Sequence, residues 1–265
     1  MIFVGIDVAK DKHDCFICNS DGEVLFNAFT IQNTIEGFNS LYQRIESVSK
    51  DFNKVKVIGV TQPVVDFIPD SEGILSYAAR VSSPSNQENF DTAGKLLAYC
   101  VKHKHYSVFE TCSLTMEIET PRDIARQILR HRSFSFQEFS QRYAQSTEFI
   151  ERECRLQDNK NRQNSFRTED GALTSEWHKL QEEVRVIAQN NYEKALSLGL
   201  AKETCRVLLP EGLTLSKLYM QGSVRSWVHF IMVRNDEGVA QLEVVDVARK
   251  AKVELLKHFP CLEEV

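Results

Sequence analysis

The sequence predicts an α+β protein in which helices flank a central sheet, with a helical portion and a small β-rich appendage at the N-terminus. Three observations lead to this prediction. Short segments that alternate apolar and polar residues, typical of strands, are separated by longer segments with helical periodicity. The first 54 residues are mainly strand-like, and a new strand pattern begins at Lys54. A chain of 265 residues, 42% of them hydrophobic, can bury one large core beside an appendage.

The appendage is predicted at residues 1–54, ahead of a main domain at 55–265. Its strand-like segments are 2–6, 14–18 and 24–29, with a turn at 20–23. Residues 33–36 then open an amphipathic helix whose apolar side chains are Phe38, Leu41 and Ile45. A hairpin, a third strand and a helix form the opening of an RNase H-like domain, with Asp7 on the first strand.

The main domain is predicted to continue with alternating strands and helices. Alternation predicts strands at 54–60, 113–119 and 214–220. Helical periodicity and terminal signals predict helices at 71–82, 88–103, 120–130, 175–198, 202–209, 223–233 and 237–259. Thr120 is the expected N-cap of the third of these helices, and Gly199 the expected end of the fourth. The polar stretch 151–174 has no core periodicity and is predicted to be an exposed loop.

Composition narrows the function classes. The net charge of -5 argues against a generally basic nucleic-acid binder, although it allows a local basic site. No apolar run approaches the roughly 20 residues that span a bilayer, so no membrane association is expected. Seven scattered cysteines lack the rhythm of a disulfide framework, which favours the reducing cytoplasm. The single CxxC, Cys15 to Cys18, has no second pair at metal spacing, and no metal site is expected.

Arginines are concentrated between residues 121 and 142. This stretch contains five Arg and no Lys, although the chain has sixteen of each. On the predicted helix, Arg122, Arg126 and Arg130 follow one another at four-residue spacing, beside an apolar face. Like charges at this spacing repel, so the stripe requires a counter-anion from the protein or from a ligand. The planar guanidinium suits phosphates and carboxylates, whereas a merely solvated face would mix Lys with Arg.

The loop after this helix combines hydroxyl groups with phenyl rings. In RHRSFSFQEFSQRY, residues 130–143, Ser and Phe alternate, so that hydroxyls are expected on one side and rings on the other. A donor-rich surface walled by aromatic rings suits a phosphate attached to a flat ring. From the residues alone, this stretch predicts a site for a nucleotide or a dinucleotide cofactor.

The same stretch matches RHRxxSxxxxSxRY, the signature of flavin-dependent thymidylate synthases. Further segments resemble elements of that family in the same order. AARVS at 78–82 resembles an early element of the family, and RVLLP at 206–210 resembles a later one. KHKHYSVFE at 102–110 resembles the family's KHGHxSPFEH. GSVRSWVHF at 222–230, followed by Val233 and Arg234, resembles the closing helix. The resemblance runs from about Val55 to Leu262, with departures from the commonest pattern at Val108, Thr111 and Gln137.

The resemblance implies the flavin-dependent thymidylate synthase fold and the reductive methylation of dUMP to dTMP. It implies methylenetetrahydrofolate as the carbon donor, NADPH as the reductant and FAD as the bound cofactor. It also implies a homotetramer in which several chains contribute to each active site. The family needs no cysteine nucleophile, so no cysteine is expected to be catalytic.

The resemblance also implies roles for individual residues. FAD would be bound by Ser82, Ser107, Arg130, His131, Arg132, Glu138, Ser223, Val224, Arg225 and His229. The substrate dUMP would be bound by Gln127, Arg130, Glu138, Ser140, Arg142, Arg206 and Arg234. Arg234 is the implied catalytic residue, because a guanidinium near the uracil ring stabilises the negative charge that develops there.

The first 34 residues resemble the N-terminus of RuvC-type insertion-sequence transposases, whose first acidic metal ligand would correspond to Asp7. One carboxylate cannot assemble a two-metal nuclease site, so a truncated fragment fused in frame is expected. Two alternatives stay open: a nucleic-acid-binding, transposase-derived fusion, and a catalytically inactive fusion. The charge argues against the first, because residues 1–54 carry five basic and eight acidic side chains, a net charge of -3.

Overall fold

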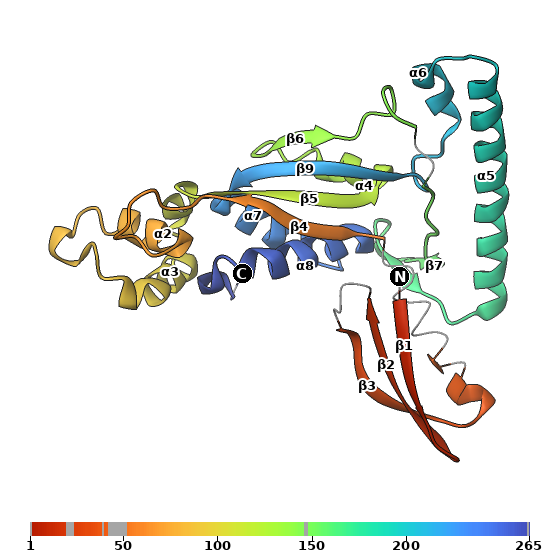
Figure 1. The fold of residues 1–265 in the computed structure, drawn as a ribbon, viewed down its shortest axis with the longest axis horizontal. Coiled ribbons are helices and arrows are strands. Elements are labelled where there is room, and N and C mark those ends of the chain that lie inside the picture. Colours follow the sequence, from red (N-terminus) through yellow and green to blue (C-terminus); the bar gives the residue numbers. More distant parts are fainter. Residues whose placement is uncertain (1, 20–23, 39, 42–51, 146–147, 264) are drawn as a thin grey trace. The chain divides into compact units, whose positions relative to one another are not determined.

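The computed structural model describes residues 2–19, 24–38, 40–41, 52–145, 148–263 and 265 (Figure 1). The chain divides into two compact units, Met1–Phe52 and Asn53–Val265. Each unit has its own hydrophobic core. The predicted division at residue 54 lies two residues beyond this one.

The N-terminal unit is an antiparallel sheet of β1 (Ile2–Val8), β2 (Lys12–Asn19) and β3 (Val24–Gln32), in the order β1-β2-β3. Residues 35–38 and 40–41 are helical, as the amphipathic pattern predicts. Cys15, Ile17, Ile31 and Leu41 form the core of the unit. The turn at 20–23 and Ile45 lie outside the described residues, and the RNase H-like assignment stays a prediction.

The second unit is built on a four-stranded antiparallel sheet in the order β4-β5-β9-β6. Its strands are β4 (Lys54–Val60), β5 (Ser113–Pro121), β6 (Ser135–Glu138) and β9 (Leu215–Ser223). The predicted strands at 54–60, 113–119 and 214–220 are therefore confirmed. β5 pairs with β9 along its full length, from Ser113 opposite Ser223 to Pro121 opposite Leu215.

One face of this sheet is covered by α4 (Arg122–Ile128), α7 (Val224–Arg234) and α8 (Leu242–Leu256) (Figure 1). Leu114, Met116 and Ile118 alternate along β5 toward these helices and are fully buried. α7 contributes Trp227 and Phe230 to the same core, both with 0% exposure. Burial of such large side chains fixes α7 against the sheet, which matters because α7 carries several predicted site residues.

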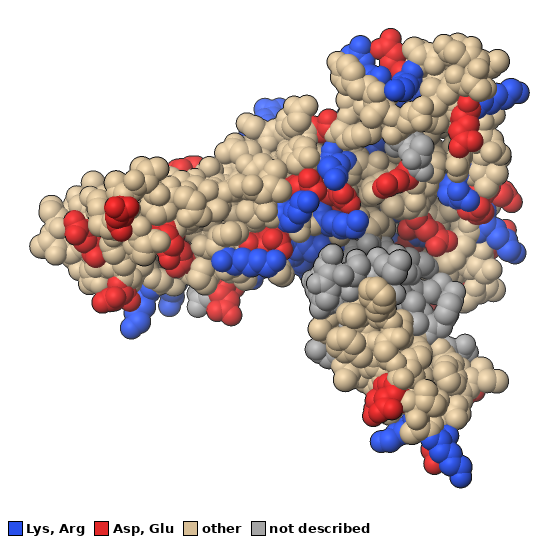
Figure 2. Space-filling model, in the orientation of Figure 1, with Lys and Arg blue, Asp and Glu red and all other residues tan. Residues whose placement is uncertain are grey.

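The opposite face of the sheet carries a ladder of ion pairs. Lys217 lies 2.9 Å from Glu119 and 3.4 Å from Glu117, and each glutamate also pairs with a lysine of β4. On the face of the molecule in Figure 2, basic and acidic side chains are likewise interspersed. Opposite charges on neighbouring strands stabilise the sheet. This surface is therefore neither mainly positive nor mainly negative.

The start of α4 differs from the prediction. Thr120 is not the N-cap, because β5 extends through Thr120 and Pro121, and Pro121 occupies the cap position without a side-chain bond. The Thr120 hydroxyl donates instead to Asn53 Oδ1, at 2.7 Å. The helix ends at Ile128, so Arg130 lies beyond it and is not part of a helical arginine stripe.

The segment 151–174 is largely exposed, as predicted, but it is not wholly irregular. It forms a hairpin of β7 (Arg155–Gln157) and β8 (Ser165–Arg167) and then enters α5 (Gly171–Ser197). Arg152 is buried, with Nη1 2.9 Å from Asp123 Oδ1 and Nη2 3.1 Å from Glu243 Oε1. Ion pairs and turn bonds, and not apolar burial, hold this segment, and a search for hydrophobic periodicity does not detect them.

The remaining helices agree with the prediction apart from their ends. They are α2 (Ser71–Ala79), α3 (Ala93–Lys102) and α6 (Lys202–Cys205), with short 3-10 turns at Phe90–Thr92, Tyr106–Glu110 and Arg206–Leu208. α5 begins four residues earlier than expected and is followed by Gly199, whose φ is +80°. α8 begins at Leu242 and not at 237.

Candidate functional site

A cluster of arginine and histidine side chains lies where the loop after α4 meets α7. The turn after Ile128 brings the His131 ring against Phe230 of α7, with 5.0 Å between the ring centroids. Arg234, the last residue of α7, donates from Nε to His131 Nε2 at 2.8 Å. Arg130 and His229 lie close enough for their charges to act on His131. The structure therefore gathers four of the predicted site residues.

The electrostatics of this cluster favour an anion. Burial lowers the pKa of His131 to about 4, and electrostatic interactions with Arg234, His229 and Arg130 act in the same direction. Burial, followed by the charge of Arg130, also lowers the pKa of Arg234. At neutral pH, His131 is consequently an uncharged acceptor for Arg234, and the partly buried guanidinium of Arg234 stands near the exposed guanidinium of Arg130. Such an arrangement is stabilised by any anion that enters it.

A cavity of about 380 Å³ lies beside this cluster, between the Tyr106–Glu110 turn and α7. His229 and Ser133 contribute polar lining, and Val228 and Met232 contribute apolar lining. Arg225 borders the same cavity and pairs with Glu110 at 2.7 Å. A hydrogen bond with Ser223 and the bond from Arg225 lower the pKa of the Glu110 carboxyl. Two predicted flavin residues, Arg225 and His229 of α7, thus line one cavity, together with Tyr106 and Glu110 from a distant segment.

The other predicted flavin residues differ in their exposure. Ser107 is exposed within the Tyr106–Glu110 turn, and Ser82 is exposed in the turn that follows α2. Arg132 is exposed in the loop after α4, whereas Val224 is completely buried at the start of α7. Val224 can therefore present only its backbone to a ligand.

Glu138 supplies the counter-anion that the arginine stripe requires. Its carboxylate lies 3.5 Å from Arg122 Nη1 and 4.0 Å from Arg126 Nη1, and it accepts from Ser216 Oγ at 3.0 Å. A protein carboxylate, and not a ligand, therefore pairs with the buried Arg122. Phe134 and Phe136 of the same loop pack in the core, so they do not wall a ligand surface as the alternation suggested.

A separate group lies near α6. Arg142 pairs with Glu203 at 3.0 Å, and Arg206 follows on the next 3-10 turn, with Ser140 hydrogen-bonded to the Arg142 backbone. Gln127 is not part of this group, because its side chain donates to that of Gln241 at 2.7 Å. Across the described ranges, we find no hydrogen bond or ion pair between the Arg142 group and the His131 cluster. Within one chain, the predicted dUMP residues therefore lie in separate places, some near α6 with Arg142 and others in the His131 cluster.

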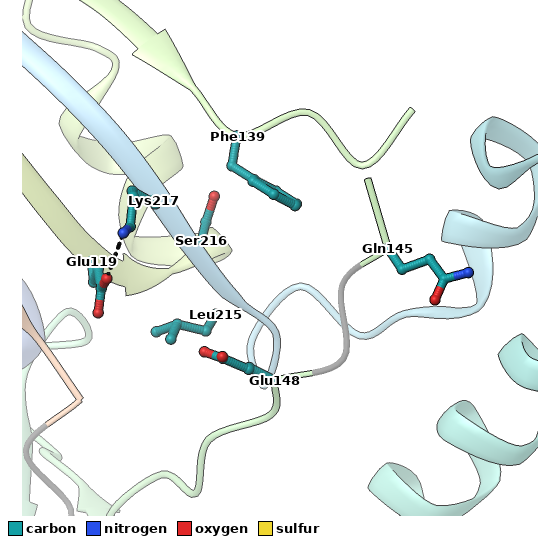
Figure 3. A pocket seen from close by; sticks show the side chains of 7 residues that line it. All are labelled: Glu119, Phe139, Gln145, Glu148, Leu215, Ser216 and Lys217. Atoms are coloured by element: carbon teal, nitrogen blue, oxygen red, sulfur yellow. Dashed lines mark ion pairs between the residues drawn. The ribbon is translucent and has the colours of Figure 1, made fainter. Parts of the chain in front are cut away.

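Figure 3 shows a second cavity, of about 230 Å³, at the end of the sheet near residue 145. Its lining combines the apolar Phe139 and Leu215 with Gln145 and the ion pair between Glu119 and Lys217. Phe139 directly precedes Ser140, so this cavity adjoins the signature loop. Sequence reasoning identified neither this cavity nor the role of Glu110, although Glu110 closes the KHKHYSVFE element.

The described part of the chain contains no group of three His, Cys, Asp or Glu side chains that could hold a metal ion. His103 and His105 both lie beside Tyr99, whose ring centroid is 4.1 Å from that of His103. None of the described helices combines the length and apolar character needed to cross a membrane.

Comparison with known proteins identifies the family. A profile described as "Thymidylate synthase complementing protein" matches residues 63–261, and a profile described as "Transposase" matches residues 4–63. A flavin-dependent thymidylate synthase of a Synechocystis species is 48% identical over 209 residues, which cover 78% of this chain and 95% of the relative. A probable flavin-dependent thymidylate synthase of Paramecium bursaria Chlorella virus 1 is 46% identical, with the same coverage.

A solved structure supports the fold. The UMP/dUMP methylase PolB of Streptomyces cacaoi, crystallised with 5-Br dUMP, superposes with a TM-score of 0.64 and 24% identity. The superposition covers 80% of this chain and 93% of that one. This likeness supports the fold, the sequence matches show the family, and the chain belongs to the flavin-dependent thymidylate synthase family.

Proposed function

We propose that this protein converts dUMP to dTMP with bound FAD, taking the one-carbon unit from methylenetetrahydrofolate and reducing equivalents from NADPH. The observation that carries the proposal is the cluster of Arg130, His131, His229 and Arg234, in which His131 and Arg234 are partly buried and Arg130 and His229 are exposed. Its positive charge lies beside a cavity with both apolar and hydrogen-bonding walls. This combination suits an anionic ligand with a flat ring.

Arg234 is the proposed catalytic residue. Its guanidinium would lie against the uracil ring and stabilise the negative charge that develops there during methylation. The bond from Nε to the neutral His131 leaves the terminal nitrogens of the guanidinium available for the substrate. Because Arg234 is partly buried, its charge is screened less by water and acts more strongly on the ring.

The residues around the larger cavity fit a flavin. Ser107, His131, Arg132, His229 and the Ser223–Arg225 turn would hold its phosphates and ring edge, and Ser82 would lie at the periphery. Bound FAD would supply hydride transfer, which no amino-acid side chain can provide. The cavity of one chain is at the small end of the usual range for ligand pockets, about 300–1,000 Å³, so part of the cofactor would lie outside it.

The separation of the two arginine groups supports a shared active site. Ser140, Arg142 and Arg206 of one chain would bind dUMP together with Gln127, Arg130, Glu138 and Arg234 of another chain. A homotetramer with sites between chains would bring both groups to one substrate. Glu138, which is already paired with two arginines, would reach FAD or dUMP only by exchanging one of these partners.

For the N-terminal unit, we propose an RNase H-like fragment without its own catalysis and without nucleic-acid binding. Its Asp7 lies opposite Asp14 in the register of β1 and β2, and the net charge of residues 1–54 is negative. We further propose that the enzyme acts in the cytoplasm, where its free thiols would remain reduced.

The proposal is tested by purifying the protein and recording its absorbance spectrum and its dUMP-dependent oxidation of NADPH. We expect a yellow protein that forms dTMP only when methylenetetrahydrofolate is present. Arg234→Ala should retain the flavin spectrum and lose at least about 100-fold in kcat, the usual cost of one electrostatic stabiliser. A colourless protein that FAD does not reconstitute would contradict the proposal.

A further inference from the structure

The backbone that follows Arg234 is held by a residue of the neighbouring helix. Arg249 of α8 donates from Nε to Asn235 Oδ1 at 3.0 Å, and its Nη2 lies 2.8 Å from Glu237 Oε1. Asn235 is the C-cap residue of α7, immediately after Arg234. One guanidinium thus contacts both the first and the third residue after the proposed catalytic arginine.

The base from which Arg249 reaches is rigid. Arg249 directly follows Ala248, whose side chain is 0% exposed. Val244 and Val247 of α8 are also 0% exposed, so this part of the helix is fixed in the core. The segment after Arg234 is held in two other ways. Asp236 accepts from the Gly238 N–H at 2.9 Å, and Asn161 of the β7–β8 hairpin donates to the Gly238 carbonyl, also at 2.9 Å.

We propose that Arg249 is a positioning residue, which fixes the end of α7 and thereby the direction in which Arg234 leaves the helix. The inference rests on the proposed function of Arg234. Its physical basis is the planar fork of arginine, which bonds two acceptors in one geometry. A guanidinium at a helix end can otherwise take many rotamers, and a displacement of about 1 Å at a reacting group can cost 100-fold in rate.

The contacts of Arg249 contribute little to the stability of the fold. The side chains of Arg249 and Glu237 are both 54% exposed, and an ion pair of this kind contributes about 0–1 kcal/mol. The effect of removing them should therefore appear in the function of Arg234 and not in folding. This separation allows the inference to be tested.

The first experiment compares Arg249→Gln with Lys257→Gln, a control that removes an exposed lysine from its ion pair with the partly buried Glu254 at the C-terminal end of the same helix. We expect Arg249→Gln to lower kcat/KM for dUMP about tenfold, with flavin spectrum and melting temperature unchanged. Lys257→Gln should match the wild type. Arg249→Lys keeps the charge without the fork and should recover only part of the loss. Wild-type kcat/KM in Arg249→Gln, or full recovery by lysine, would overturn the inference.

The second experiment asks whether Arg249 acts through Arg234, using the dissociation constant for dUMP measured by calorimetry. Arg249→Gln should weaken dUMP binding in the wild type and have no further effect in Arg234→Ala, because the group that it positions is absent. Asn235→Ala breaks the same bond from the other side and should reproduce the result. Additive losses would overturn this inference alone. Unchanged dUMP affinity and activity in Arg234→Ala would overturn the role of Arg234 and the inference with it.

Discussion

Lys104 has a backbone conformation that most residues avoid. Its φ is +59°, and it is the only residue besides glycine with positive φ among the described residues. It follows α3, where the Lys104 N–H donates to Val101 and the His105 N–H donates to Cys100. These two bonds form a Schellman motif, whose left-handed position is usually glycine. The family pattern KHGHxSPFEH indeed has glycine here.

We predict that Lys104→Gly stabilises the protein. A side chain in the left-handed region costs about 1–2 kcal/mol, and part of this gain is offset by the greater freedom of glycine in the unfolded chain. The free energy of unfolding should rise by roughly 0.5–1 kcal/mol, measured by chemical denaturation. Lys104→Ala, which removes the ammonium but keeps Cβ, should not be stabilised. Equal stabilisation of both variants would contradict the backbone argument.

His131 shows what a residue pattern can and cannot establish. The motif RHR identifies a site for anions, and the structure does bring Arg130, His131 and Arg234 together. The motif does not show that the middle residue is a neutral acceptor. That property depends on burial and on nearby charges, including His229 and Arg234 from about a hundred residues away. Contacts with residues so far away along the chain cannot be predicted from the motif itself.

At the scale of elements, a buried ion network joins three separate parts of the chain. Arg152 pairs with Asp123 at the start of α4 and with Glu243 in the first turn of α8, and Arg155 of β7 also pairs with Glu243. Burial would raise the pKa of Glu243, but the hydrogen bond from Arg155 and the charges of Arg152 and Arg155 outweigh it and hold the pKa at about 2. The network connects the hairpin to the helices of the core.

This network predicts a loss of stability in acid. Because the pKa of Glu243 is lower in the folded state, its contribution is fully present above pH 4.5 and is lost as the pH falls toward 2. The contribution is up to about 3 kcal/mol. Glu243→Gln should be less stable than the wild type by roughly 3 kcal/mol at pH 7, since it leaves buried arginines without this charge.

The measurement is urea denaturation of both proteins between pH 7 and pH 3. The difference in free energy of unfolding should shrink as the pH falls, which isolates Glu243 from the other carboxylates. A difference that stays constant with pH would contradict the assignment. Lys257→Gln, which removes an exposed lysine from its pair with Glu254, should show neither the large cost nor the pH dependence.

Most helices and strands of the second unit could be predicted, because apolar periodicity determines them. β4 and β5 alternate clearly, and the end of α5 follows from Gly199. The prediction failed where polar contacts decide the structure, as in the β7–β8 hairpin. The backbone carbonyl of Arg152 there accepts from Trp177 Nε1 at 2.8 Å and from Gln181 at 3.0 Å. Contacts between distant polar residues leave no period in the sequence.

At the scale of the whole molecule, Asn53 defines where the second unit begins. It is 3% exposed, and it donates from Nδ2 to the Glu243 carbonyl at 3.1 Å and to Asp246 at 2.8 Å. It also accepts from Thr120 at Oδ1 and, through its carbonyl, from Lys250 at 2.7 Å. Asn53 thus satisfies polar groups on β5 and α8, although the sequence pattern assigned it to the appendage.

We therefore predict that deletion of residues 1–52 preserves the stability of the second unit. Deletion of residues 1–53, which also removes Asn53, should lower that stability. With an initiator methionine before Asn53, the shortened protein should keep its flavin spectrum, its assembly in analytical ultracentrifugation and its dUMP-dependent NADPH oxidation. A chain that starts at Lys54 should lose roughly 1–3 kcal/mol, since the Thr120 hydroxyl becomes an unsatisfied buried donor. Asn53→Ala in the full-length chain separates this effect from truncation and should cost a similar amount. Loss of assembly or flavin after deletion of 1–52 alone would show that the N-terminal unit takes part in forming the enzyme.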